Sequence, residues 1–388
     1  MNLAERVGTR QNNFDALRLV AAVMVLVSHC FPLTGQPEPL ASISQESFGE
    51  LGVSIFFAIS GFLIAGSWSH DPTLGRFAVK RGLRLMPGLW VAVLVTALVI
   101  GTAVTTLSVS SYFTNIDVYR YIAQNSVLYT VNGHLPGVFV NNVYPDAVNG
   151  SLWTLPVEAF AYLGVAVLGV LGALRGRATV LPLLSFLVLL VLSMPFVGLN
   201  SVSVAGPVSG HIGLILYHGG LFNLGVLLYM WRERVPLRWD VAAGLMIAWV
   251  AVSQSDWMHP VALLAVPYLV LMLAYRTPRS LSVITRPGDL SYGIYVYAFP
   301  TQQVAGYAFG PKLGPGGMLA VVAVPVYLAA LASWRLIEAP ALRRKPRTTV
   351  SAQPRPAVAL GGEPEPAYLG TTPNSAGTGF RTRPRRPG

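Results

Sequence analysis

Apolar residues form long runs along this chain, and polar residues gather in the stretches between them. A membrane-spanning helix needs roughly 20 consecutive, predominantly apolar residues, and most of the runs approach that length. The pattern therefore predicts an all-α protein, a polytopic transmembrane helix bundle of about ten spans. The predicted spans are 14–33, 50–68, 85–107, 151–173, 180–199, 211–231, 240–255, 260–275, 290–309 and 317–338.

Basic residues are concentrated in alternate connections between these runs. Lys and Arg are enriched in the cytoplasmic loops of membrane proteins, so the pattern predicts that both termini and the Arg-rich connections are cytoplasmic. The long connection 108–150 then lies outside, where we expect it to fold partly as a re-entrant or interfacial cap. The residues that carry the bias are Arg76, Lys80, Arg81 and Arg84; Arg175 and Arg177; Arg232, Arg234 and Arg238; and Arg276, Arg279 and Arg286, against only Arg120 and Lys312 in the other connections.

The composition excludes a soluble protein. Of the 388 residues, 53% are hydrophobic and only 11% are charged, whereas about 25% charged residues is typical of soluble domains. We expect a multi-pass protein of the cell membrane with a cytoplasmic N-terminus (1–13), a transmembrane domain (14–342) and a basic cytoplasmic tail (343–388).

The net charge of +11 does not indicate nucleic-acid binding, because much of it belongs to this tail. The tail is rich in Pro, Gly and Thr and has no apolar periodicity, so it is predicted to be disordered. Its first basic residues, Arg343, Arg344, Lys345 and Arg347, follow the last span directly. We expect them to contact anionic lipid headgroups.

Two ionisable residues, Arg18 and His29, lie inside the first apolar run. They are about three turns of ~3.6 residues apart, so they share one helix face, with Arg18 near one end of the span and His29 towards the other. An ionisable side chain at such a position costs at least ~2.5 kcal/mol and commonly faces the protein interior, where it marks a functional site. A snorkelling arginine and a packed histidine are the structural alternative.

Further polar residues recur at the ends of other spans. Arg81 and Arg84 are three apart and would be neighbours on a helix, where planar guanidinium groups suit phosphate; a plain cytoplasmic anchor is the alternative. Glu158 is placed at a depth similar to that of His29, so the two are candidates for a base and its orienting group, or for two acid/base groups. The structural alternative is an ion pair of Glu158 with an inner arginine.

The ninth and tenth spans carry two more pairs. Tyr292 and Tyr295 lie near the cytoplasmic side, where they either line a ligand path or belong to an interfacial aromatic belt. Arg335 and Glu338 are expected to pair with each other or with basic loops. The chain contains no P-loop, no G-x-S-x-G motif and no zinc motif, and no metal site is predicted.

Taken together, these segments resemble the membrane acyltransferase-3 family, whose members O-acylate surface polysaccharides, lipopolysaccharide, Nod factors and some macrolides. The matching pieces occur in the family's order and cover residues 14–342. They are Arg18 with ten residues before His29; a Phe-Phe-x-Ile-Ser-Gly-Phe core within 52–64; Arg81-x-x-Arg84 before Pro87; Ser151-Leu-Trp-Thr-Leu-x-x-Glu158; Ser291-Tyr292-Gly-Ile-Tyr295; and Glu338-x-Pro340.

The resemblance implies an acyl-CoA donor, acetyl-CoA in the first instance, with His29 as the catalytic residue and Arg18, Arg84 and Glu158 as supporting site residues. Arg81 and Arg84 would hold the donor phosphates at the cytoplasmic face, and Tyr292 and Tyr295 would line the same path. His29 would deprotonate an acceptor hydroxyl as general base, and a covalent acyl-histidine intermediate is the alternative chemistry.

Three functions remain open on the sequence. The leading one is O-acylation of a cell-envelope glycan or glycolipid, and a second replaces that acceptor with a macrolide or another small natural product. The third is a proton-coupled transporter or flippase in which Arg18, His29 and Glu158 form a proton relay. A transporter would show proton-dependent flux and no thioester cleavage.

Overall fold

The computed structural model describes residues 2–7, 12–128, 131–174, 180–193, 209–278 and 283–346. Within these ranges the chain is helical, and no strand forms beyond two isolated bridges. The predicted all-α class is therefore confirmed. The α-helices are α1 (Leu3–Val7), α2 (Phe14–Cys30), α3 (Pro39–Ile43), α4 (Phe48–His70), α5 (Leu74–Leu94), α6 (Gly101–Val104), α7 (Val109–Thr114), α8 (Ile116–Ser126), α9 (Thr154–Val170), α10 (Val180–Ser193), α11 (Ser209–Met230), α12 (Trp239–Ala251), α13 (Met258–Arg276), α14 (Ser291–Phe309), α15 (Pro315–Ser333) and α16 (Ala339–Arg343).

Short segments of other helix types complete the chain. A π-helix, η2 (Val95–Ile100), joins α5 to α6, and a second, η7 (Trp334–Glu338), joins α15 to α16. Single 3₁₀ turns are η1 (Pro32–Thr34), η3 (Gly150–Trp153) and η6 (Gly310–Lys312). The segments η2 and η7 extend the helices on either side of them, so that 74–104 and 315–343 are continuous helical stretches.

Seven helical stretches among the described residues are long and apolar enough to cross a membrane. Each of the ten predicted spans contains a helix, but α10 and α12 are shorter than a span and α14 is not among the seven. The span count of ten and the cytoplasmic placement of both termini stay predictions. The seven stretches are 14–34, 48–70, 74–104, 150–170, 213–230, 258–276 and 315–343.

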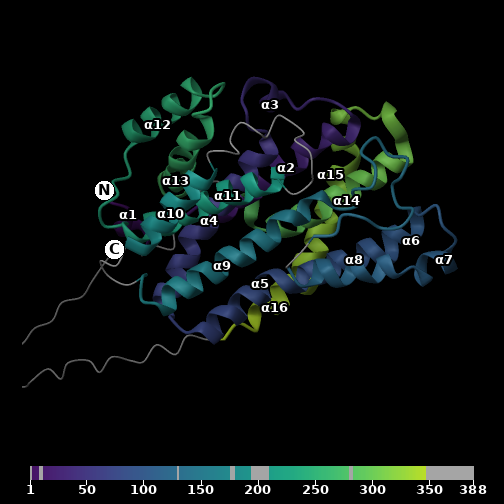
Figure 1. Ribbon diagram of the computed structural model, residues 1–388, viewed down its shortest axis with the longest axis horizontal. Helices are drawn as coiled ribbons and strands as arrows, with labels where there is room; N and C mark the ends of the chain where they lie inside the picture. Colours follow the sequence, from purple (N-terminus) through teal and green to yellow (C-terminus); the bar gives the residue numbers. More distant parts are fainter. Residues whose placement is uncertain are drawn as a thin grey trace, which may run out of the picture. The chain divides into compact units, whose positions relative to one another are not determined.

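Helix α4 lies at the centre of the bundle, packed against α2, α9, α11 and α13 (Figure 1). Its glycines permit this close packing. A Cβ added at Gly61 would lie 1.9 Å from the carbonyl oxygen of Phe222 on α11, and one added at Gly52 would lie 2.6 Å from the carbonyl oxygen of Ala21 on α2. Backbones approach this closely only where the side chain is absent.

The connection after α6 turns back along the helix that precedes it. Helix α8 runs beside α5 (Figure 1), and the indole nitrogen of Trp90, near the middle of the 74–104 stretch, donates to the carbonyl oxygen of Ser126 at 3.1 Å. The buried Tyr112 of α7 donates to the carbonyl oxygen of Ala97 at 2.8 Å. This segment therefore returns along a spanning helix, and the re-entrant or interfacial cap expected for the connection stays a prediction.

The N-terminal end of the chain lies beside a basic connection. The amide of Ala4 donates to the carbonyl oxygen of Arg232 at 2.8 Å, and Asn2 forms an isolated bridge with Pro236. The N-terminus therefore lies on the α11–α12 connection, one of the Arg-rich segments. The tail beyond Pro346, predicted to be disordered, lies outside the described residues.

The predicted orientation is tested with single cysteines at Ser110 and Arg234, which are both exposed and lie at connections after α6 and after α11. In sealed vesicles, a membrane-impermeant maleimide should label Ser110→Cys only from the outer side and Arg234→Cys only from the cytoplasmic side. The unsubstituted chain is the control, since its one cysteine, Cys30, is buried. Labelling of both variants from the same side would contradict the orientation.

Candidate active site

A cavity of about 390 Å³ lies between the starts of α2, α9 and α14, the middle of α4 and α5, and the last described turns of the chain. Six of the seven residues predicted from the sequence line it. They are Arg18, Arg81, Arg84, Glu158, Tyr292 and Tyr295. The further lining residues that carry polar groups are Asp15, Ser60, Thr154, Tyr162, Asp289, Ser291, Trp334 and Lys345.

An ion pair between Arg84 and Asp289 joins α5 to the start of α14. The Arg84 Nη2 and the Asp289 Oδ2 are 2.6 Å apart, and both side chains are largely buried. The hydroxyl of Ser291 donates to the other Asp289 oxygen at 2.5 Å. Burial alone would raise the pKa of Asp289, but the charges of Arg84 and Arg18 lower it below its ordinary value. Asp289 therefore stays ionised and fixes the Arg84 guanidinium at the cavity wall.

Glu158 points into the cavity from the second turn of α9. Its Oε1 accepts a hydrogen bond from the hydroxyl of Ser60 on α4 at 3.2 Å and another from Tyr162, one turn further along α9. The Arg81 guanidinium carbon lies 5.9 Å from the ring centroid of Tyr162 and 5.9 Å from that of Phe77. The Nε of Arg81 is buried and has no hydrogen-bond partner among the described residues.

Tyr292 and Tyr295 are both buried, so they are not part of an interfacial belt. The Tyr292 hydroxyl donates to the carbonyl oxygen of Leu85 at 2.7 Å. The Tyr295 hydroxyl donates to the carbonyl oxygen of Ser151 at 2.8 Å and lies 2.6 Å from the hydroxyl of Thr154. Of the two alternatives for these tyrosines, the structure places them on the lining of a cavity.

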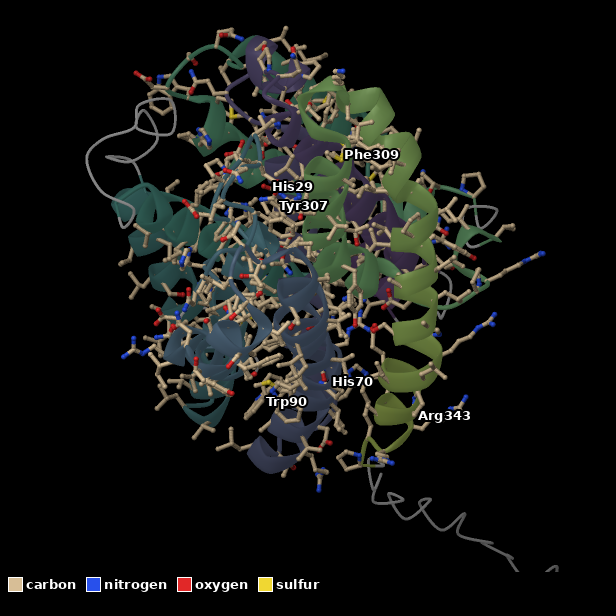
Figure 2. All side chains as sticks on the ribbon, turned by 90° about the vertical axis from the view of Figure 1, so that its right-hand side faces the viewer. His29, His70, Trp90, Tyr307, Phe309 and Arg343 are labelled. Atoms are coloured by element: carbon tan, nitrogen blue, oxygen red, sulfur yellow. The ribbon has the colours of Figure 1, made fainter. Side chains whose placement is uncertain are left out.

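His29 is the one predicted site residue that does not line the cavity. It lies away from the end of the bundle that carries His70 and Arg343 (Figure 2). Its ring meets Phe299 of α14 edge-to-face, with centroids 5.1 Å apart, and its Nδ1 is buried without a hydrogen-bond partner among the described residues.

One face of α14 connects the cavity with His29. Tyr292, Tyr295 and Phe299 have the i, i+3, i+7 spacing of a single helix face. Phe299, which touches His29, is one turn beyond Tyr295, or about 6 Å along the axis. Phe56 of α4 packs on Tyr295 with ring centroids 5.8 Å apart, so these two aromatic rings stand at the inner end of the cavity on this route.

Among the described residues, no hydrogen bond joins His29 to Glu158, whose partners are Ser60 and Tyr162. Phe299 touches His29 and also packs on Gly150, since a Cβ added there would lie 2.7 Å from the Phe299 ring. The chain has therefore already reached the depth of His29 at Gly150. Glu158 follows eight residues later, by way of the buried turn η3, and lies well inside. The predicted span 151–173 assumed instead that residue 151 lies at the membrane surface.

Arg335 and Glu338 were expected to pair with each other or with basic loops, and no ion pair between the two is found among the described residues. Both belong to the π-helix η7, whose wider turn changes the faces that successive residues occupy. Arg335 is exposed, whereas Glu338 is buried and accepts a hydrogen bond from Ser333 at 2.8 Å. Glu338 lies against Gly88 of α5, just behind the cavity wall.

Asp289, Tyr162 and Lys345 are among the cavity residues that sequence reasoning missed. Asp289 directly precedes the tyrosine motif, and Tyr162 follows Glu158 by one helical turn, so both carried a signal from spacing. Lys345 carried none, since it is one of several basic residues after the last span. It was expected at lipid headgroups, but it lines the cavity.

The comparisons with known proteins identify the family. A family model described as an acyltransferase domain matches residues 11–334. The chain is 32% identical over 339 residues to the O-acetyl transferase of Shigella phage Sf6, with 85% of this chain and 95% of that protein covered. It is 30% identical over 362 residues to Nodulation protein 10 of Rhizobium leguminosarum bv. viciae, with 87% and 95% covered. No solved structure matches.

The chain therefore belongs to the acyltransferase-3 family and is a multi-pass membrane O-acyltransferase. The resemblance drawn from the six motifs is confirmed. Between the enzyme and the transporter that the sequence left open, the family match decides for the enzyme.

The ion pair that holds Arg84 predicts a stability difference. Asp289→Asn leaves a largely buried guanidinium without its partner, which should destabilise the protein by about 3 kcal/mol. The matched control is Asp117→Asn, because Asp117 pairs with Arg120 at 2.9 Å on the exposed face of α8, where a pair contributes at most about 1 kcal/mol. Thermal unfolding in detergent should show a clearly lower Tm for Asp289→Asn than for Asp117→Asn. Equal Tm values would show that the Arg84–Asp289 pair is not structural.

Proposed function

We propose that this acyltransferase-3 protein moves an acetyl group from acetyl-CoA to a hydroxyl of a cell-envelope glycan. The observation that carries the proposal is the single cavity that gathers Arg18, Arg81, Arg84 and Glu158, with one face of α14 leading from it to His29. A basic cavity at one depth and a histidine at another suit a donor that enters from one side and an acceptor that arrives from the other.

The cavity has the charge that a CoA donor requires. Arg18 has its Nη1 3.6 Å from the exposed Asp15, and Arg84 is paired with Asp289. Arg81 belongs to none of the ion pairs found among the described residues, and its buried Nε lacks a partner there. A guanidinium group binds phosphate oxygens through two parallel N–H groups. Arg81 therefore takes the donor diphosphate, with Arg84 held beside it.

The acyl arm then follows α14 towards His29. The donor phosphates remain near the start of α5, and the pantetheine lies along Tyr292 and Tyr295. The thioester passes Phe56 and reaches the pocket between Phe299 and His29. Glu158 acts on the donor side of this route, because its hydrogen bonds to Ser60 and Tyr162 fix the ring on which Arg81 rests.

At His29 the neutral imidazole takes the proton from the acceptor hydroxyl as the oxygen attacks the thioester carbonyl. A C–O bond forms, the C–S bond breaks, and the proton passes from the imidazole to the departing CoA thiolate. General-base catalysis of this kind contributes typically ~10²–10⁴-fold. No net proton is released, so the step needs no separate proton path.

Two observations support a glycan as the acceptor. His29 lies away from the end that carries His70 and Arg343, which under the predicted topology places it towards the outer surface, where envelope glycans are exposed. The phage relative is named an O-acetyl transferase. A screen of envelope glycans and small hydroxylated natural products against acetyl-CoA identifies the acceptor class by the product that gains an acetyl group.

The role of His29 is tested by substitution. His29→Ala should lower kcat for acetyl transfer by at least about 10²-fold with little change in the KM for acetyl-CoA, because proton removal matters only in the transition state. The measurement is thiol release and acetylated glycan formed by purified protein in detergent or proteoliposomes. His70→Ala, at an exposed helix end, is the control and should keep its activity. A His29→Ala enzyme with normal turnover would refute the general-base role.

The role of Arg81 predicts the opposite kinetic pattern. Phosphate contacts are the same in the ground state and the transition state, so Arg81→Ala should raise the KM for acetyl-CoA with little change in kcat. Arg81 is a cleaner probe than Arg84, whose loss would also leave Asp289 unpaired. Arg335→Ala, which removes an exposed arginine, is the control. A collapse of kcat with unchanged KM in Arg81→Ala would place this arginine at the reacting atoms instead.

A further inference from the structure

A fourth cation, Lys345, lines the cavity together with Arg18, Arg81 and Arg84. It lies two residues beyond the end of α16, and its neighbours in the chain, Arg343 and Arg344, are exposed and are not part of the lining. The chain thus directs one of three consecutive basic side chains inward. This selective placement distinguishes Lys345 from a residue that merely faces lipid headgroups.

The charges of the cavity leave Lys345 unbalanced. Arg84 is paired with Asp289, and Arg18 faces Asp15. Arg81 and Lys345 belong to no ion pair among the described residues, and the Nε of Arg81 is buried without a partner. The lining carries four cations, Arg18, Arg81, Arg84 and Lys345, against the three carboxylates of Asp15, Glu158 and Asp289. Glu158 is the carboxylate that acts on Arg81, so Lys345 is the cation left for an anionic ligand.

The surroundings of Lys345 disfavour its protonated form. Burial lowers the pKa of Lys345 to about 8, and the nearby charges of Arg81 and Arg84 act in the same direction. An anion in the cavity would raise the pKa of Lys345 again, because an opposite charge nearby favours the protonated form.

Lys345 also has a defined place along the cavity. Lys345 follows the last helix. Arg343, two residues before it, lies at the end of the bundle away from His29 (Figure 2). Arg84 lies one turn further into α5 than Arg81. A CoA donor whose thioester points to His29 therefore has its opposite end, the 3′-phosphoadenosine, at the side of the cavity where Lys345 lies.

We propose that Lys345 binds the 3′-phosphate of the CoA donor and makes the enzyme select CoA over 3′-dephospho-CoA. The inference rests on the proposed donor, and it assigns to Lys345 a contact distinct from the diphosphate contact of Arg81. Lys345 is thus a specificity residue for the nucleotide end of the donor, far from the reacting atoms.

The test is the binding of CoA and of 3′-dephospho-CoA to the purified full-length protein, measured by calorimetry. The wild type should bind CoA about tenfold more tightly than 3′-dephospho-CoA, which is the effect expected of one hydrogen bond to a charged group. Lys345→Met should lose this preference by weakening the binding of CoA alone. Lys345→Arg should keep it, and Arg344→Met, the matched control on an exposed neighbour, should also keep it.

Two results would overturn the inference. One is an equal loss of affinity for both ligands in Lys345→Met, which would mean a contact to the diphosphate or a general charge effect. The other is the same loss of preference in Arg344→Met. Failure of the proposed function has a different signature, since wild type would then release no thiol from acetyl-CoA. A wild type that binds neither ligand would overturn both proposals.

The pH dependence gives a second readout. Because the pKa of Lys345 is lowered, its charge is lost as the pH rises through about 8. The preference of wild type for CoA should therefore fall between pH 7 and pH 9, whereas Lys345→Arg should keep its preference over that range. A fall of equal size in both proteins would assign the titration to another group and overturn the role of Lys345. The other charged or titratable groups around it are Asp15 and Arg18 on α2; Lys80, Arg81 and Arg84 on α5; Glu158 and Tyr162 on α9; and Asp289 and the tyrosines of α14.

Discussion

A charged side chain inside a membrane-spanning bundle must meet a partner or a polar cavity, and this constraint organises the protein. Four elements that are distant in sequence, α2, α5, α9 and the segment before α14, bring their charged residues to the same cavity. The Arg84–Asp289 pair joins two of them, and the hydrogen bonds of Glu158 join α9 to α4. The close packing of α4 through Gly52 and Gly61 holds the remaining helices around these contacts.

Helix α14 shows why hydropathy alone misses a helix of the bundle. It is buried around most of its surface and carries Gln302 and Gln303, whose side-chain nitrogens donate to backbone carbonyl oxygens of α2 and of the 108–150 connection. Asn142 in turn donates to Gln303. A helix surrounded by protein has no need of an apolar surface. In the proposed mechanism, the polar and aromatic face of α14 forms the route between the donor cavity and His29.

Much of this arrangement follows from the sequence. The apolar runs predicted where the helices lie. The ionisable residues within and beside the spans predicted many of the residues that line the cavity, because such residues are rarely placed in a membrane without a role. What the sequence did not reveal is where the chain departs from simple helical spans. The buried turn η3 carries Glu158 deeper than a span that begins at the surface would. The π-helix η7 turns Glu338 away from Arg335, and the irregular turn after α16 directs Lys345 inward. Each depends on local geometry that no periodicity encodes.

The proposed mechanism requires that one cavity holds the donor and that α14 leads its thioester to His29. The most direct measurement is a structure of the full-length protein, determined by electron cryomicroscopy, with a non-hydrolysable acetyl-CoA analogue bound. We expect diphosphate density against Arg81 and Arg84, and pantetheine density along Tyr292 and Tyr295 that ends between Phe299 and His29. An analogue bound outside the cavity, or one whose acetyl end lies at the mouth beside Lys345, would contradict this mechanism.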